Sequence, residues 1–521
     1  MKKLAIVLVA VLLNASQAWS GSPYMATGIK IGEVTSNEAI VWVRLTRDAE
    51  RVDFGAPMPE ITYTHAETGE PLEVRQGRRP NHAVPKVAFP EGSSVAPIEG
   101  AAPGTDGVAR VLYRTEDAGR FQATPWQTVK SDADFTRQFR LAGLEPATQY
   151  RIAVEFGTRP EDELKRLSGA FRTAPAADIE APVTFTVVTG QRYPNRDSDR
   201  GWKIYDEMRQ LDPDFFVHTG DILYYDQLAK TVDLANWHWQ RTYSLPGLVE
   251  FHRQVPSYFI KDDHDTWVND AWPTMQSHFM GEFTFQQGVQ IFLDQVPMGE
   301  KTYRTFRWGK DLQVWLVEGR DYRSANPDPD GPEKSIWGAE KMTWFQRTVQ
   351  ESDATFRVLI SPTPVVGPDR PNKNDNHANE GFAHEGNLLR AFIASQDNMV
   401  VVCGDRHWQY HSIHPLGVEE FSTGALVDAN SRWGRLPGDP DSTDPEGLIE
   451  QPFTNQEPTG GFLRVSILGG ATPTAVFQPC GTTSMPYDSA SQAMRRTSEM
   501  PPTFVASGCA MSMARRVKNG T

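Results

Sequence analysis

The sequence predicts a layered α/β domain that is preceded by a small β-sandwich. From Pro182 onward, continuous apolar and β-branched segments alternate with segments of helical spacing, as is typical of α/β layers. Before that point, short strand-like segments are separated by turns, and no helix-length periodicity interrupts them. The chain has 521 residues, which is enough for two or more domains with a large core.

The N-terminal part is expected to consist of hairpins. Residues 29–45 alternate apolar and polar side chains on both sides of the turn Thr35-Ser36-Asn37, which predicts two antiparallel strands. Strand character returns at residues 135–141 and 149–156. Residues 51–130 are rich in Pro, Gly and charge, and we interpret them as elaborated loops with a few short strand-like pieces. The stretch Ala174–Ala177 is interpreted as a linker.

The second part contains the segments expected to be buried strands and helices. Its apolar runs have the length and the β-branched content of strands that are buried on both faces. The expected strands are 183–189, 215–217, 257–260, 313–317, 356–361 and 399–403, and the expected helices are 201–211 and 341–350. The tail at residues 485–521 is rich in Ser, Met and Pro and is expected to be poorly ordered.

The first 18 residues resemble a secretory signal peptide. Lys2 and Lys3 precede the apolar run Leu4–Leu13, and Ser16-Gln17-Ala18 offers small residues for cleavage after Ala18. The run is too short to cross a bilayer, which needs about 20 apolar residues. A retained lipid-embedded anchor is the alternative. We therefore expect a periplasmic or secreted protein that is exported by a Sec-type route and has no transmembrane anchor.

The charge of the chain limits the classes of partner. The formal net charge is −14, and loss of Lys2 and Lys3 makes it −16. Nucleic acids and anionic membranes select basic surfaces, so no nucleic-acid-binding surface is expected. A phosphate substrate remains compatible with this charge, because bound cations can invert the local field.

Three cysteines allow one disulfide at most. Cys480 and Cys509 could pair in an oxidising compartment, or both could stay reduced, and their spacing does not decide between these alternatives.

Three short polar motifs each follow an expected strand. In open α/β sheets, ligands bind at the carboxyl ends of the strands. Carboxylate, phenol and imidazole groups together suit Fe, Mn, Zn or Ca. A single Gly-Asp turn after a strand is usually only a turn, but three such motifs in order favour a metal site. The motifs are HTGDILYYD at 218–226, KDDHD at 261–265 and GDRHW at 404–408.

This order of motifs resembles the calcineurin-like metallophosphoesterase superfamily and, within it, the PhoD-like alkaline phosphatases. The similarity continues in GEVTSNEAIVWVRL at residues 32–45 and in VEGRDYRS at residues 317–324. It implies a metallophosphoesterase-type β-sandwich flanked by helices, preceded by a small all-β, fibronectin III-like domain. The implied limits are 24–176 for the N-terminal domain with its insertion, 182–484 for the catalytic domain and 485–521 for the tail.

The resemblance also implies a role for individual residues. Asp221 would bridge two metal ions, and Tyr224 would bind one of them. Asp263 would bind the second ion, and His264 beside it would face the substrate as the general acid. Arg320 and Arg323 are candidates for phosphate contact, although they could instead form ion pairs within the protein. The other implied residues are the metal-binding pair Asp405 and His407 and the phosphate contacts Arg320 and Arg323.

The implied function is hydrolysis of a small phosphate ester by a metal-activated hydroxide, as in an exported alkaline phosphatase or phosphodiesterase. Two ions of Ca, Fe, Mn or Zn would be bound per chain. Two rival hypotheses remain. One is a related metallohydrolase that acts on a different ester, and the other is a degenerate protein of this fold with weak activity or a binding role. Neither the ester preference nor the oligomeric state follows from the sequence.

The sequence departs from the family at one expected ligand. Where these phosphatases carry a cysteine before a glutamine, this chain has Thr189-Gly190-Gln191. Glycine has no side-chain ligand, so the first metal position is expected to be weaker, filled differently or lost. The candidates to replace the ligand are Gln191, Asp197 and Asp199.

Overall fold

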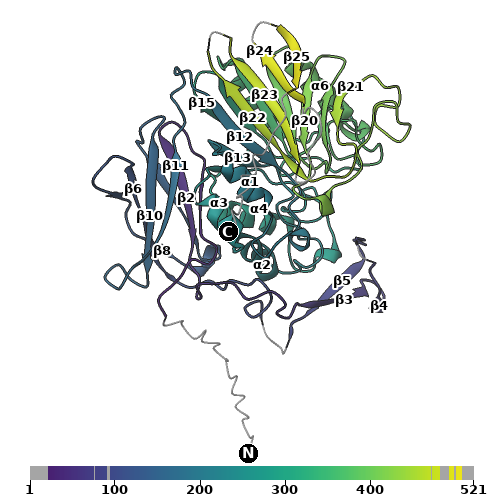
Figure 1. Cartoon of the computed structure of the whole chain (residues 1–521). Coiled ribbons are helices and arrows are strands. Elements are labelled where there is room, and N and C mark those ends of the chain that lie inside the picture. Colours follow the sequence, from purple (N-terminus) through teal and green to yellow (C-terminus); the bar gives the residue numbers. More distant parts are fainter. Residues whose placement is uncertain are drawn as a thin grey trace, which may run out of the picture.

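Two large β-sheets packed face to face form the centre of the molecule (Figure 1). One sheet has ten strands and the other has seven. The computed structural model describes residues 21–75, 77–90, 94–470, 472–481, 492–497 and 500–506. The expected signal peptide lies outside these ranges, and so does Cys509 of the candidate disulfide.

The ten-stranded sheet combines strands from both ends of the chain. Strands β12, β13, β14 and β1 are parallel neighbours, whereas β22 pairs antiparallel with β12. Its strands, in spatial order, are β25 (Met500–Ala506), β24 (Gln492–Thr497), β23 (Thr474–Gly481), β22 (Gly461–Leu468), β12 (Val183–Val188), β13 (Phe215–His218), β14 (Ser257–Phe259), β1 (Ile29–Gly32), β2 (Glu38–Arg44) and β9 (Thr136–Ala142).

The seven-stranded sheet comes entirely from the second half of the chain. Strands β16, β17, β18 and β20 are parallel, and the outer strands are antiparallel to their neighbours. In spatial order they are β15 (Arg304–Trp308), β16 (Leu312–Leu316), β17 (Phe356–Ser361), β18 (Met399–Cys403), β20 (Glu419–Thr423), β19 (Gln409–Ile413) and β21 (Glu450–Thr454).

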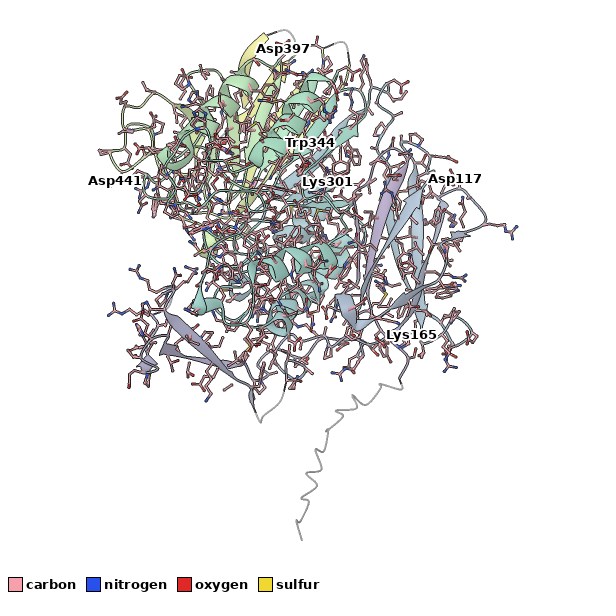
Figure 2. All side chains as sticks on the ribbon, turned by 180° about the vertical axis from the view of Figure 1, so that it is seen from behind. Asp117, Lys165, Lys301, Trp344, Asp397 and Asp441 are labelled. Atoms are coloured by element: carbon pink, nitrogen blue, oxygen red, sulfur yellow. The ribbon has the colours of Figure 1, made fainter. Side chains whose placement is uncertain are left out.

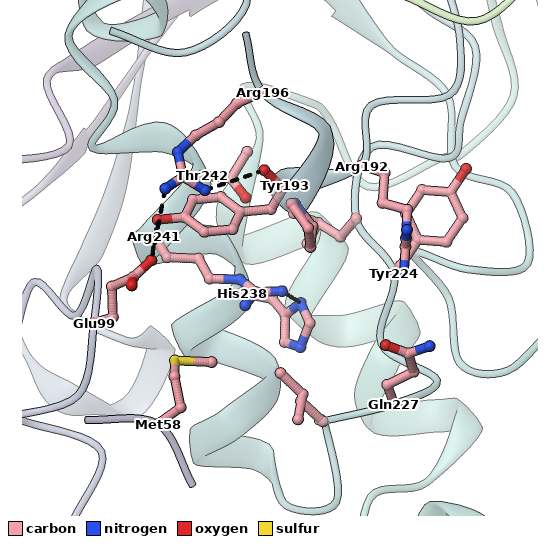
Figure 3. A pocket seen from close by; sticks show the side chains of 13 residues that line it. Met58, Glu99, Arg192, Tyr193, Arg196, Tyr224, Gln227, His238, Arg241 and Thr242 are labelled. Carbon is pink, nitrogen blue, oxygen red and sulfur yellow. Dashed lines mark hydrogen bonds and ion pairs between the residues drawn. The ribbon is translucent and has the colours of Figure 1, made fainter. Parts of the chain in front are cut away.

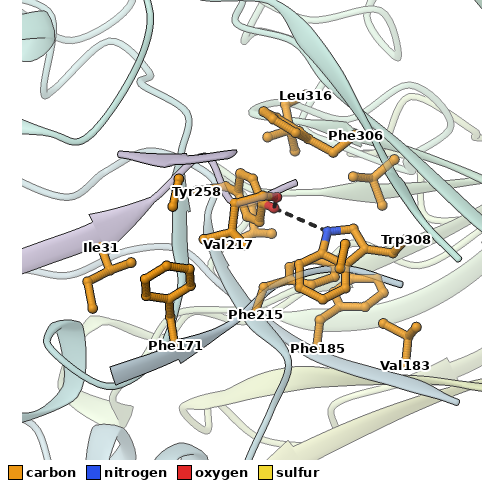
Figure 4. Packing of buried hydrophobic residues seen from close by; sticks show 14 of the residues in the cluster. Ile31, Phe171, Val183, Phe185, Phe215, Val217, Tyr258, Phe306, Trp308 and Leu316 are labelled. Atoms are coloured by element: carbon orange, nitrogen blue, oxygen red, sulfur yellow. Dashed lines mark hydrogen bonds between the residues drawn. The ribbon is translucent and has the colours of Figure 1, made fainter. Parts of the chain in front are cut away.

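Side chains from facing strands of the two sheets fill the space between them (Figure 4). The rings of Phe185 and Phe215 stack with centroids 4.5 Å apart. The indole N–H of Trp308 donates to the Tyr258 hydroxyl at 3.1 Å, so the buried polar atoms of both rings have a partner. The next residue along a strand faces the other way, because successive side chains alternate across a sheet. For example, Trp315 of β16 contacts the outer helices.

Helices cover the outer faces of both sheets. Helices α1 to α4 pack on the ten-stranded sheet, and α5 and α6 pack on the seven-stranded sheet, as shared hydrophobic clusters show. A capping box between Thr284 and Gln287 fixes the start of α4. No helix in the described ranges is long and apolar enough for a membrane span. The helices are α1 (Ile204–Gln210), α2 (Val232–Tyr243), α3 (Pro246–His252), α4 (Phe285–Gln295), α5 (Gly338–Gln350) and α6 (Ala383–Ala394).

A separate N-terminal sheet packs against the β1–β2–β9 end of the ten-stranded sheet. The side chains of Asp117 and Lys165 lie at its two ends (Figure 2). Its apolar side chains belong to the same core as those of the two large sheets. The sheet contains β11 (Lys165–Arg172), β10 (Gln149–Gly157), β6 (Gly107–Thr115), β7 (Gln122–Ala123) and β8 (Gln127–Val129).

A small three-stranded sheet projects from the segment between β2 and β6 (Figure 1). It lies against the loop that contains His278, whose backbone N–H donates to the carbonyl oxygen of Asn81 at 3.2 Å. We call residues 51–102 the insertion. Its strands are β3 (Glu60–His65), β4 (Pro71–Leu72) and β5 (Ala83–Ala88).

The layered α/β architecture predicted from the sequence is confirmed, whereas a fibronectin III-like N-terminal domain stays an expectation. The hairpin at residues 29–45 is present as β1 and β2, and two strands match the expected bounds 356–361 and 399–403. Residues 51–130 are more regular than expected, because β6 is a nine-residue strand. Within the expected tail, β24 and β25 extend the main sheet, and the rest of the tail lies outside the described residues.

Candidate active site

The candidate residues lie where strands of the two large sheets end. Asp221 follows β13 and Asp405 follows β18, each one residue after a glycine. Both aspartates have a positive φ, 55° and 54°, which lifts the carboxylate out of the strand direction. A Cβ at Gly404 would lie 2.3 Å from the Thr219 hydroxyl oxygen, so only glycine fits this turn.

Three of the predicted residues meet at this edge. Ligand atoms of Asp221, Asp263 and His264 all lie within 4.8 Å of one another, and the three side chains are buried. Two carboxylates and an imidazole at this separation have the donor chemistry of a binding site for Fe, Mn or Zn. The sequence motifs after β13 and β14 therefore converge as expected.

His407 joins this cluster through a defined ring orientation. Its Nδ1 lies 2.8 Å from the carbonyl oxygen of Asn430, which can only accept, so Nδ1 carries the proton. Burial lowers the pKa of His407, so the ring is neutral and Nε2 carries a lone pair. That lone pair lies 3.1 Å from Oδ2 of Asp221 and 3.4 Å from the Tyr224 hydroxyl. Electron-rich atoms this close need a proton or a cation between them.

Asn430 holds this group of residues together. Its backbone carbonyl oxygen accepts from His407, and its side-chain amide donates to the carbonyl oxygen of Gly190 at 2.8 Å and to the Tyr224 hydroxyl at 3.3 Å. Burial raises the pKa of Tyr224, so the phenol keeps its proton and donates to Asp221 at 3.1 Å.

Asp221 has a buried oxygen that no donor among the described residues satisfies. Its Oδ1 is buried and has no hydrogen-bond partner among the described residues. Burial alone would raise the pKa of Asp221, but the charge of His264 and the His407 hydrogen bond lower it. A buried carboxylate oxygen without a donor is costly, so the residues here fit a bound metal ion.

Asp263, in contrast, is surrounded by donors. The backbone N–H of Asp270 donates to its Oδ2 at 2.6 Å, and Arg320 lies 3.8 Å away. Lys373 forms ion pairs with Asp270 and Asp375 at 2.5 and 3.2 Å. Although burial raises it, the pKa of Asp263 falls below its ordinary value because Arg320, His264 and Lys373 are positive.

His264 is oriented by a carboxylate that the sequence reasoning did not single out. Its Nδ1 donates to Oδ2 of Asp226, and its ring lies 4.4 Å from that of Tyr224. Burial lowers the pKa of His264, but the carboxylates of Asp226, Asp263 and Asp221 raise it to about 10. With Nδ1 engaged, Nε2 is the nitrogen available for proton transfer.

Asp226 is in turn held by the insertion. Arg79, which lies between β4 and β5, places its Nε 2.5 Å from Oδ1 of Asp226. The same oxygen accepts the backbone N–H of Asn269 at 2.8 Å. These donors, together with His264, lower the pKa of Asp226 to about 2 despite its burial. The insertion thus reaches the ring of His264 through one intervening carboxylate.

The other two acidic residues of the KDDHD motif support the loops. Asp262 accepts from Nε of Arg320 at 2.6 Å, and burial raises its pKa to about 7. Asp265 accepts the backbone N–H groups of Ile222 and Asp262 at 3.3 and 3.2 Å. The four neighbouring aspartates therefore do not all face one bare site.

The two arginines proposed to bind phosphate have protein partners here. Arg320 pairs with Asp262, but its two terminal nitrogens have no hydrogen-bond partner among the described residues. Arg323 donates to the side-chain oxygen of Asn326 at 2.8 Å and to the carbonyl oxygen of Asp375 at 2.9 Å. Arg320 therefore has unused donors, whereas Arg323 supports a loop. Phosphate contact by either arginine stays a prediction.

Asp405 stands apart from the other expected ligands. Its carboxylate contacts the guanidinium of Arg406 and is not in the Asp221, Asp263 and His264 cluster. Arg406 also pairs with Asp369 at 2.6 Å. A metal-binding role of Asp405 stays a prediction.

Gly190 lies at the site, as its place in the sequence predicted. A Cβ at this residue would lie 3.1 Å from Nε2 of His407, so a side chain here would enter the same group of ligands. Its φ is +69°, which strains any other residue. The candidate replacements face elsewhere: Gln191 accepts from Tyr205, Asp197 accepts a backbone N–H and Asp199 is exposed.

Three residues that matter to this geometry were missed from the sequence. Asp226 had a signal, because it closes the HTGDILYYD motif five positions after Asp221. Asn430 and Arg79 had none, since they lie outside every motif and reach the site only through the tertiary fold.

Comparisons with known proteins agree with this arrangement. Residues 185–431 match the family model of the PhoD-like phosphatases. One similar solved structure is described as PhoD: it is 16% identical over 94% of this chain and 90% of that chain, with a TM-score of 0.64. Another is purple acid phosphatase PPD1 from yellow lupin (Lupinus luteus) seeds, with 12% identity, 87% and 71% coverage and a TM-score of 0.50. No curated protein matches the chain by sequence.

The layered fold, the ligand cluster at the strand ends and the matched family model define the class of this protein, which is a phosphoric ester hydrolase. Residues 185–431 of this chain belong to the PhoD-like phosphatase family.

Proposed function

We propose that this protein is an exported, metal-dependent phosphoesterase that cleaves small phosphate esters. The observation that carries the proposal is the buried cluster of Asp221, Asp263 and His264, whose ligand atoms lie within 4.8 Å at the ends of parallel strands. The neutral His407 and the unpartnered oxygen of Asp221 support a cation at the same place. Fe, Mn, Zn and Ca are the candidate ions, two per chain.

The proposed ligands have the roles that the family resemblance implies. Asp221 would bridge the two ions, with Tyr224 and His407 on one of them and Asp263 on the other. Asp405 would complete the set after separating from Arg406. The bound ions would lower the pKa of the attacking water and offset the negative charge of the phosphate oxygens.

His264 would act as the general acid. Asp226 fixes the ring through Nδ1, which leaves a proton on Nε2 for the departing alcohol oxygen. As water attacks phosphorus and the bond from phosphorus to the ester oxygen breaks, that proton would neutralise the alkoxide. The unused terminal nitrogens of Arg320 would hold a phosphate oxygen, and Arg323 is the weaker candidate because its terminal nitrogens already donate to protein oxygens.

The domain limits and the export route belong to the same proposal. The N-terminal domain would span residues 24–176 and the catalytic domain 182–484, with the boundary between β11 and β12. Residues 1–18 would be removed as a Sec-type signal peptide, which would release the protein to the periplasm or the medium.

A second candidate function has its own support. Gly190 provides no ligand and Asp405 contacts Arg406, so the first metal position has fewer donors than the family pattern implies. A degenerate protein with weak activity or a binding role would explain both observations.

Metal analysis combined with activity assays separates these alternatives. We expect purified protein to contain two metal ions per chain, or one ion plus a second that added divalent metal restores. It should hydrolyse nitrophenyl monoesters or diesters in the metal-loaded form. Metal-loaded protein without activity on either ester class would contradict the phosphoesterase and favour the binding role.

A further inference from the structure

A cavity of about 300 Å³ lies beside the candidate active site (Figure 3). Tyr224 lines this cavity, and its phenol oxygen is also 3.1 Å from Oδ2 of Asp221. Because one side chain borders both places, an ester whose phosphate lies at Asp221 can place its alcohol portion in the cavity. The volume is at the small end of the range for ligand pockets, which suits a compact organic group.

The charged residues around the cavity favour an anion. Its one carboxylate among the described lining residues, Glu99, is already engaged: Oε1 accepts the Tyr193 hydroxyl at 3.1 Å, and Oε2 accepts the backbone N–H of Gly55 at 3.0 Å. His238 is neutral, because burial lowers its pKa well below the ordinary value. The three positively charged lining residues are Arg192, Arg196 and Arg241.

Arg241 is the most informative of these cations. Its side chain is nearly buried, with 5% of the residue exposed, and its Nε has no hydrogen-bond partner among the described residues. One terminal nitrogen lies 3.0 Å from Nδ1 of His238. Burial, with Arg51 and Arg196 nearby, lowers the pKa of Arg241 to about 9. Glu99 compensates part of this positive charge, and a bound anion would compensate more of it.

The walls of the cavity come from two parts of the chain. Met58 and Glu99 belong to the insertion, which lies outside the matched residues 185–431. Arg192 and Tyr224 lie on the opposite side (Figure 3). In this chain, the insertion and the matched residues therefore form the pocket together.

We propose that this cavity binds the alcohol portion of the phosphate ester and selects alcohols that carry a second negative charge, such as a carboxylate. The proposal rests on the proposed phosphoesterase function. The arginines that line the cavity would bind the second negative charge of the substrate. Tyr193, Leu228 and Met58 would cover the apolar part of the alcohol.

A pair of substrates tests this selectivity. Release of phosphate is measured for benzyl phosphate and 4-carboxybenzyl phosphate, which differ by one carboxylate remote from the reacting bond. We expect the wild-type kcat/KM to be about tenfold higher for the carboxylated ester, mainly because its KM is lower. A difference of about tenfold is what one charge-assisted hydrogen bond typically contributes. Arg192→Gln and Arg196→Gln should each reduce that ratio toward one.

The matched control is Arg200→Gln, an exposed arginine of the same loop that does not line the cavity. It should keep the wild-type ratio. An equal kcat/KM for the two esters in the wild type, or a ratio unchanged in both pocket variants, would overturn the proposal.

A binding measurement separates this proposal from the phosphoesterase itself. Ligand-observed NMR compares benzyl alcohol with 4-(hydroxymethyl)benzoate, neither of which contains phosphate. The wild type should bind the carboxylated alcohol about tenfold more tightly, and Arg196→Gln should lose that difference. If neither ester is hydrolysed but this preference is present, the phosphoesterase proposal fails and the anion pocket stands. Equal affinities of the wild type for the two alcohols would contradict the proposed anion pocket, even if the enzyme hydrolyses phosphate esters.

Discussion

The two ends of the candidate site differ in how they stabilise a buried carboxylate. At the His407 end, which comprises Asp221, Tyr224 and His407, the carboxylate meets a neutral imidazole and a phenol, and one of its oxygens has no partner among the described residues. At the Arg320 end, which comprises Asp263 and Arg320, the carboxylate receives a backbone N–H at 2.6 Å and lies 3.8 Å from a guanidinium.

The difference indicates where a metal ion is indispensable. The Arg320 end contains positive charge of its own, so Asp263 is stable as an anion without a metal. The His407 end contributes only lone pairs and a carboxylate of which one oxygen has no donor among the described residues. A cation would stabilise that oxygen. We therefore expect folding to tolerate metal loss, and activity to depend most on the His407 end.

The largest expected effect follows from Asp221→Asn. An amide cannot replace the carboxylate in its proposed role as the bridge between two cations, so turnover should fall by at least about 10³-fold while the fold is kept. Metal content and phosphate release measure the effect. Asp212→Asn is the matched control, because Asp212 is an exposed aspartate that also has a positive φ, 48°. Wild-type turnover with normal metal content in Asp221→Asn would show that the His407 end does not hold the metal.

His264→Ala should give the next largest effect and should depend on the leaving group. We expect losses of about 10²- to 10³-fold for alkyl phosphates and much smaller losses for nitrophenyl esters, whose alkoxide needs no proton. Steady-state kinetics on both ester types measure this, with the exposed His82→Ala as control. Equal losses on both types would instead make His264 a ligand or a structural residue.

Arg79→Gln tests whether the insertion takes part in this chemistry. Without its ion pair to Asp226, His264 is held less firmly, and kcat for alkyl phosphates should fall about tenfold, with nitrophenyl esters less affected. The neighbouring Arg78 is exposed, so Arg78→Gln provides the control. A uniform loss on both ester types would mean that Arg79 acts on the fold and not on His264.

The smallest expected change concerns metal retention at Gly190. Gly190→Cys and Gly190→Ala share the backbone strain of φ +69° and should both lower the free energy of unfolding by about 1–2 kcal/mol. Only the thiolate of the cysteine variant should slow metal removal by a chelator, because sulfur is a stronger donor than water. Release at the same rate from both variants, or a wild type that resists chelation, would contradict a weakened metal position.

The features that the sequence predicted correctly are those encoded by residues close together in the chain. The strands at residues 356–361 and 399–403 are uninterrupted β-branched runs, and their bounds agree with the structure. The residues Asp221, Asp263 and His264 converge because motifs that follow parallel strands share one sheet edge. Gly190, where the sequence departs from the family motif, also lies at the site, since a Cβ there would be 3.1 Å from Nε2 of His407.

What could not be predicted depends on long-range contacts. The side chains of β6 alternate between buried and less buried positions, as in a typical strand. The strand was not predicted because its flanking segments are rich in Pro and Gly. Its extended conformation is stabilised by antiparallel pairing with β10. Arg79 and Asn430 approach the site from loops that no periodicity describes. Asp405 follows the family motif, yet its side chain contacts Arg406, the next residue in the sequence.

The position of β1 in the main sheet bears on how the chain is synthesised. All four residues of β1 are buried, and its Gly32 lies opposite Ser257 of β14, a strand made much later. Until that strand leaves the ribosome, the hairpin of β1 and β2 keeps an open, apolar edge that can pair with another chain. A fragment that stops at residue 176 would keep that edge permanently, so the N-terminal part should aggregate when it is expressed alone.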